Sequence, residues 1–74
     1  MTDNLLSSEL LNALVMKYRA NIQSAVATMK IYLQNPVGIG EHPQHLEEMD
    51  KLVEDIASNR DKLEALEQHF QCNH

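Results

Sequence analysis

The residue types best suited to chemistry gather in one short segment, 37–43, which reads Val-Gly-Ile-Gly-Glu-His-Pro. Glycine amides and the free N–H groups at the start of a helix can hold an anion, and a histidine can add a positive charge. With the histidine that follows it, this segment predicts a site for a small anionic ligand such as a nucleotide, built from Gly38, Gly40, Glu41, His42 and His45. The alternative is structural, with a glycine making a turn. We favour that alternative, because phosphate-binding loops need a strand before their glycines and none is predicted.

A metal site and a catalytic site are both less well supported. His42 and His45 lie three residues apart beside acidic residues, a spacing that can place two ligands on one helical face. Two histidines need further ligands from another element, and His69 and His74 lie at the far end of the same predicted helix. No nucleophile stands beside a base, and the neighbours of Cys72 offer it no activation. We therefore expect no metal, no cofactor and no enzymatic activity.

The elements that carry these residues follow from the helix breakers. Both prolines and both glycines lie within 36–43, so two uninterrupted stretches remain. They predict a helix over about 5–34, a turn over 35–42, a helix over about 43–70 and a frayed tail over 71–74, all in one domain, 1–74. Rods of about 45 and 42 Å joined by a short connection favour antiparallel neighbours. The predicted fold class is an all-α, antiparallel two-helix hairpin.

Apolar residues recur in both helices at coiled-coil spacing. In the first helix the steps alternate between four and three residues, through Leu11, Val15, Tyr18, Ile22, Ala25, Met29 and Tyr32. Further apolar residues flank this stripe, including Val26 and Leu33, so the apolar face is wider than one partner helix covers. In the second helix the predicted stripe is Leu46, Met49, Val53, Ile56, Leu63 and Phe70, with Leu52, Ala57 and Leu66 beside it.

The small size of the chain favours self-association. A chain of 74 residues builds only a marginal core, and its single cysteine cannot close an internal disulfide. We expect a homo-oligomer, most simply a dimer that forms a four-helix bundle, although a trimer or larger assembly fits the same pattern. The predicted oligomer interface consists of Leu11, Val15, Tyr18, Ile22, Val26 and Met29. The two tyrosines of the stripe are assigned to the core, with a ligand pocket between hairpins as the alternative.

Charge is distributed unevenly and limits the classes of partner. Residues 1–36 hold two acidic and three basic residues, net +1, and residues 37–74 hold nine acidic and three basic residues, net −6. An acidic surface repels phosphate backbones, so nucleic-acid binding is not expected, whereas a basic protein surface is a suitable partner. No run of about 20 apolar residues is present to span a membrane, and the acidic start differs from a signal peptide. We expect a cytoplasmic protein.

One segment carries a resemblance to known sequences. The run NPVGIGEHPQHLEEMDKL at 35–52, followed by DKLE at 61–64, resembles short uncharacterised proteins of T4-type tailed phages, including marine ones. The resemblance covers about the second half of the chain, and its specific part is GIGEHP. It implies a viral accessory protein made in the bacterial cytoplasm, and it brings no catalytic residues with it.

These observations predict a non-enzymatic protein–protein interaction or adaptor protein, such as a phage accessory factor that acts on a host protein. The alternative is an oligomeric binder of a small anionic ligand at the tip of the hairpin.

Overall fold

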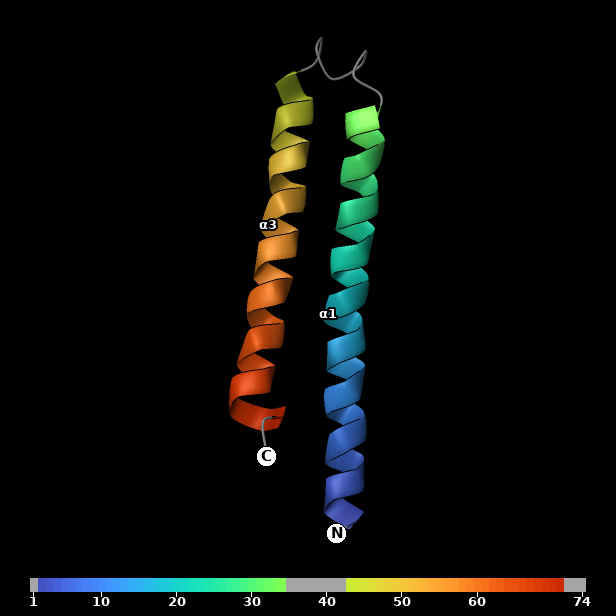
Figure 1. The fold of residues 1–74 in the computed structure, drawn as a ribbon, viewed down its shortest axis with the longest axis vertical. Helices are drawn as coiled ribbons and strands as arrows, with labels where there is room; N and C mark the ends of the chain where they lie inside the picture. The colour runs from blue at the N-terminus through green and yellow to red at the C-terminus, as the bar shows by residue number, and fades with distance from the viewer. Residues whose placement is uncertain (1, 35–42, 72–74) are drawn as a thin grey trace.

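The fold is a pair of antiparallel helices (Figure 1). The computed structural model describes residues 2–34 and 43–71, with side chains over 8–34 and 45–70. Helix α1 runs over Thr2–Gln34 and α3 over Pro43–Leu66, and α3 continues into the π-helix η1, Glu67–Gln71. The two rods lie side by side, with the start of α1 and the end of η1 toward the same end of the molecule. Within the described residues there is no strand, so the predicted all-α hairpin of two helices is confirmed.

Burial along α1 follows the predicted stripe. Apart from Val26 and Thr28, the buried or half-buried side chains recur at steps of four and three residues, at Leu11, Val15, Tyr18, Ile22, Ala25, Met29 and Tyr32. Helix α3 lies alongside α1 (Figure 1), so these side chains pack against α3, and we call the shared contact line the seam. No proline or glycine interrupts α1, so its backbone hydrogen bonds continue unbroken along the whole seam.

The seam of α3 differs from the predicted stripe. Its buried or half-buried side chains are His45, Met49, Leu52, Ile56, Asn59, Leu63 and Leu66. Met49, Ile56 and Leu63 were placed correctly, whereas Leu46 and Val53 are 66% and 50% exposed. The pattern failed because a count of apolar residues chooses Leu46 over the polar His45, cannot separate Val53 from its apolar neighbour Leu52, and passes over the polar Asn59. The polar residues occupy the seam because each has a partner on α1.

The core of one hairpin is thin. Among the described side chains, only Ala25 and Leu66 are buried apolar residues, at 4% and 8% exposure, and Asn59 is a buried polar residue at 6%. Large apolar side chains remain exposed on both helices, including Leu33 at 60% and Phe70 at 65%. A single hairpin therefore leaves much of its apolar surface in water, which costs stability in proportion to the exposed area.

Over the described residues, neither helix combines the length and the apolarity that crossing a membrane requires.

Candidate functional site

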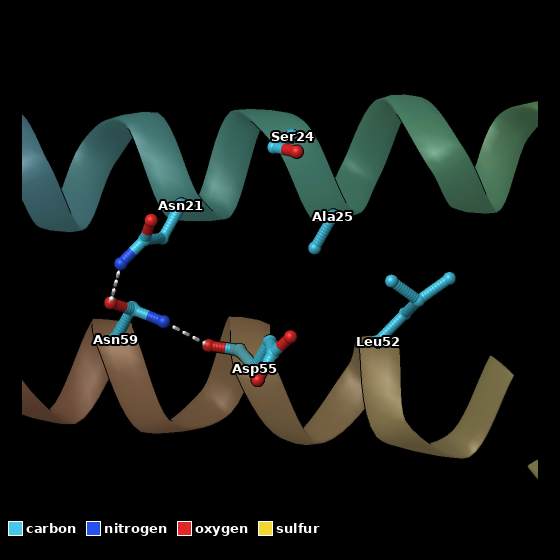
Figure 2. A pocket seen from close by; sticks show the side chains of 6 residues that line it. All are labelled: Asn21, Ser24, Ala25, Leu52, Asp55 and Asn59. Atoms are coloured by element: carbon cyan, nitrogen blue, oxygen red, sulfur yellow. Dashed lines mark hydrogen bonds between the residues drawn. The ribbon is translucent and has the colours of Figure 1, made fainter. Parts of the chain in front are cut away.

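One long edge of the hairpin carries polar side chains from both helices. Asn21 of α1 donates through Nδ2 to Oδ1 of Asn59 on α3, at 3.0 Å. Asn59 donates in turn through its own Nδ2 to the main-chain carbonyl of Asp55, at 2.7 Å (Figure 2). The buried amide of Asn59 is thus satisfied as donor and as acceptor, which offsets the cost of removing it from water.

A shallow hollow opens beside this amide pair. It has a volume of about 290 Å³, and in Figure 2 Ala25 and Leu52 reach toward each other across it from the two helices. Polar groups make up the rest of its lining, namely Asn21, Ser24, Asp55 and Asn59. The lining offers hydrogen-bond donors, acceptors and one carboxylate, but no nucleophile paired with a base, so it supports polar contacts rather than covalent chemistry.

The same edge continues toward the hairpin tip through Tyr32. Its hydroxyl donates to Oε1 of Glu48, and its ring stacks on His45 with centroids 5.4 Å apart and planes inclined by 30°. The hydrogen bond to Glu48, followed by desolvation and the negative charge of Glu48, raises the pKa of Tyr32 above its usual 10.0. The ring of Tyr32 therefore lies in the seam, and its hydroxyl contacts the exposed Glu48 at this edge.

At the other end, the ammonium group of Lys62 lies over the ring of Tyr18, 5.4 Å from its centroid. Such a cation–π contact adds about 0.5–1 kcal/mol at an exposed site. Both seam tyrosines thus have partners on α3, which favours the core assignment over a ligand pocket between hairpins.

An alkaline titration tests the contact between Tyr32 and Glu48. In a Tyr18→Phe background, the remaining tyrosine should titrate above pH 10.0, followed as tyrosinate absorbance at 295 nm. Glu48→Gln should lower its pKa, because an amide is the weaker acceptor and carries no charge. Because the folded pKa exceeds the unfolded one, the contact contributes stability below pH 10 that is lost as the pH rises through the folded pKa.

Glu47→Gln provides the matched control for this titration, since Glu47 is exposed and the hydroxyl of Tyr32 donates to the neighbouring Glu48. An equal shift of the tyrosine pKa in both variants would contradict a direct contact.

The predicted anion site is only partly described. Gly38, Gly40, Glu41 and His42 lie outside the described residues, and His45 is half-buried in α3 against Tyr32. Across 2–34 and 43–71, no three His, Cys, Asp or Glu residues are grouped so that they could hold a metal ion. The anion site and the absence of a metal remain predictions.

The structure describes every residue of the predicted oligomer interface. All six of its residues, Leu11, Val15, Tyr18, Ile22, Val26 and Met29, are half-buried. Five of them belong to the seam, so α3 already covers part of each. Val26 lies one residue beyond the seam, on the opposite side from the amide pair.

Sequence reasoning missed the cross-helix contacts of the site, namely the Asn21–Asn59 pair, the contacts of Tyr32 with Glu48 and His45, and the position of Lys62 over Tyr18. The available signal was the place of Asn59 in the heptad, four residues before Leu63 and three after Ile56. A lone asparagine at a core position of a coiled coil commonly specifies how the helices align.

In comparisons with known proteins, no family model, no curated protein and no solved structure matches this chain.

Proposed function

We propose that this chain is a non-enzymatic protein-interaction or adaptor protein, whose hairpins associate as a dimer in a four-helix bundle. The outer face of α3 then binds a basic surface on another protein. The phage resemblance suggests an accessory factor that acts on a host protein in the bacterial cytoplasm.

The observation that carries the proposal is a row of exposed acidic side chains along α3. They recur at helical spacing on the face turned away from α1, as Glu47, Asp50, Glu54, Asp61 and Glu64. The row extends over about 25 Å at 1.5 Å per residue. Charged rows of this kind steer a partner of opposite charge and select it over other proteins.

Affinity capture from a bacterial lysate tests this proposal. The chain should retain a protein that is released by about 0.5 M salt, because screening shortens the range of exposed charges. Glu47→Gln, Asp50→Asn and Glu54→Gln together should abolish its retention, followed by mass spectrometry of the eluate.

Lys17→Gln with Lys30→Gln, on α1, supplies the matched control and should leave the retained protein unchanged. If the acidic-row variant captures the same protein as the unmodified chain, the proposed binding face is wrong.

A further inference from the structure

The hairpin has a second long edge, and it is apolar. We call the edge that carries the polar side chains the polar edge. Four of its residues each come one position before a seam residue, namely Asn21, Glu48, Asp55 and Lys62. Val26, Leu33, Leu46 and Val53 each come one position after a seam residue, so they lie along the opposite edge. We call these four residues the apolar edge.

Contacts across the seam show which residues of the two helices lie at the same level, that is, at the same height along the long axis of the hairpin. Tyr32 stacks on His45, so the next residues along each chain, Leu33 and Leu46, lie at about the same level. By the same alignment Val26 lies level with Val53. Their exposed fractions reach 60% for Leu33 and 66% for Leu46, so this part of the edge exposes apolar side chains of both helices to water.

The exposed area of the chain is larger than its mass requires. The accessible surface is 6057 Å², whereas a globular monomer of 8.4 kDa exposes about 4,600 Å². The excess is about 1,400 Å², which exceeds the ~800 Å² that each partner contributes to a standard stable interface. The elongated hairpin therefore exposes more surface, beyond that of a compact monomer, than one standard interface would cover.

We propose that a second copy of this chain packs on the apolar edge, so that two apolar edges meet around a two-fold axis. This inference rests on the proposed dimer and names the surface that forms it. A two-fold interface needs a surface that matches itself, and the four edge residues meet this condition because none is charged. Half-buried Ile22, Met29, Met49 and Ile56 border the edge and would be covered by the same contact.

Two arginines determine the direction of the second copy. Arg19 and Arg60 are exposed and lie at one level on this edge, beyond Val26 and Val53. A parallel dimer would place four guanidinium groups together at one level, whereas an antiparallel dimer about the centre of the apolar edge separates the two pairs along the long axis. Like charges repel across an interface, so the antiparallel dimer is favoured.

A pair of matched variants tests the surface. Leu33→Glu and Ile31→Glu change two α1 side chains of similar exposure, 60% and 63%, but Ile31 lies off the apolar edge. By sedimentation equilibrium the unmodified chain should have twice the 8.4 kDa chain mass. Leu33→Glu should raise the dimer dissociation constant at least about tenfold, and Ile31→Glu should change it less than about threefold.

Val53→Glu, on the other helix, should weaken the dimer as Leu33→Glu does, with helicity checked by circular dichroism at high protein concentration. A dimer that survives both edge variants overturns this surface and leaves the proposed dimer standing. A monomeric unmodified chain overturns both proposals.

A spin label tests the direction. With Glu9→Cys in a Cys72→Ser background, labels in an antiparallel dimer should lie more than about 40 Å apart. Labels within about 25 Å, the separation expected for neighbouring helices in a parallel dimer, would overturn the antiparallel arrangement.

Discussion

Replacing Ile22 with aspartate is expected to dissociate and unfold the protein in a single transition. Ile22 is half-buried in the middle of the α1 seam, and a charge placed there without a partner costs about 3 kcal/mol. A domain of this length has about 4–11 kcal/mol of stability in total, so a large share is lost. Urea unfolding followed by circular dichroism and light scattering should show the helix signal and the dimer mass falling together.

Gln23→Asp is the matched control for Ile22→Asp. It introduces the same residue one position along α1 at an exposed site, and it should cost less than about 0.7 kcal/mol, the range of helix propensity. If Ile22→Asp gave a folded monomer, the hairpin would be stable alone and the dependence of folding on association would be wrong.

The second large effect is expected at Asn59, where Asn59→Asp keeps the shape but changes the hydrogen bonding. The new carboxylate can still accept from Asn21, but it no longer donates to the carbonyl of Asp55. At 6% exposure an ionised group beside that carbonyl should cost about 3 kcal/mol at pH 7. Thermal unfolding should show this as a clear fall in Tm.

This loss should depend on pH. Burial raises the pKa of the introduced carboxyl in the folded state above its unfolded value of about 3.9. Its protonated form can donate to the carbonyl again, so the stability should return below about pH 4 and be lost as the pH rises through the folded pKa. Asn12→Asp, exposed on α1, makes the same chemical change as a control. A loss that is equal at pH 3 and pH 7 would contradict the buried hydrogen bond.

The two helices and the seam of α1 could be predicted because they depend on local properties of the chain. Proline and glycine positions determine where helices can run, and apolar spacing determines which face of α1 is covered. The seam of α3 could not be obtained in this way. His45 and Asn59 lie in it because Tyr32 and Asn21 face them, and such pairing depends on how two helices align.

The division of the hairpin into a polar and an apolar edge also could not be predicted from the sequence. Leu46 and Val53 belong to the predicted apolar stripe of the second helix, but they lie outside the seam and are exposed. Only the contacts of Asn21, Tyr32 and Lys62 reveal which flank of each helix is polar. The edge left over is then the apolar one.

The cross-helix contacts also set a rule for how this chain can change in length. Asn21 and Tyr32 are eleven residues apart in α1, and their partners Glu48 and Asn59 are eleven residues apart in α3. An insertion of one residue in either interval would turn the helix beyond it by about 100° and break one of the two contacts. Insertions and deletions in descendants of this sequence should therefore be absent from both intervals or occur in both together, whereas length changes between Gln34 and Pro43 leave both intervals intact.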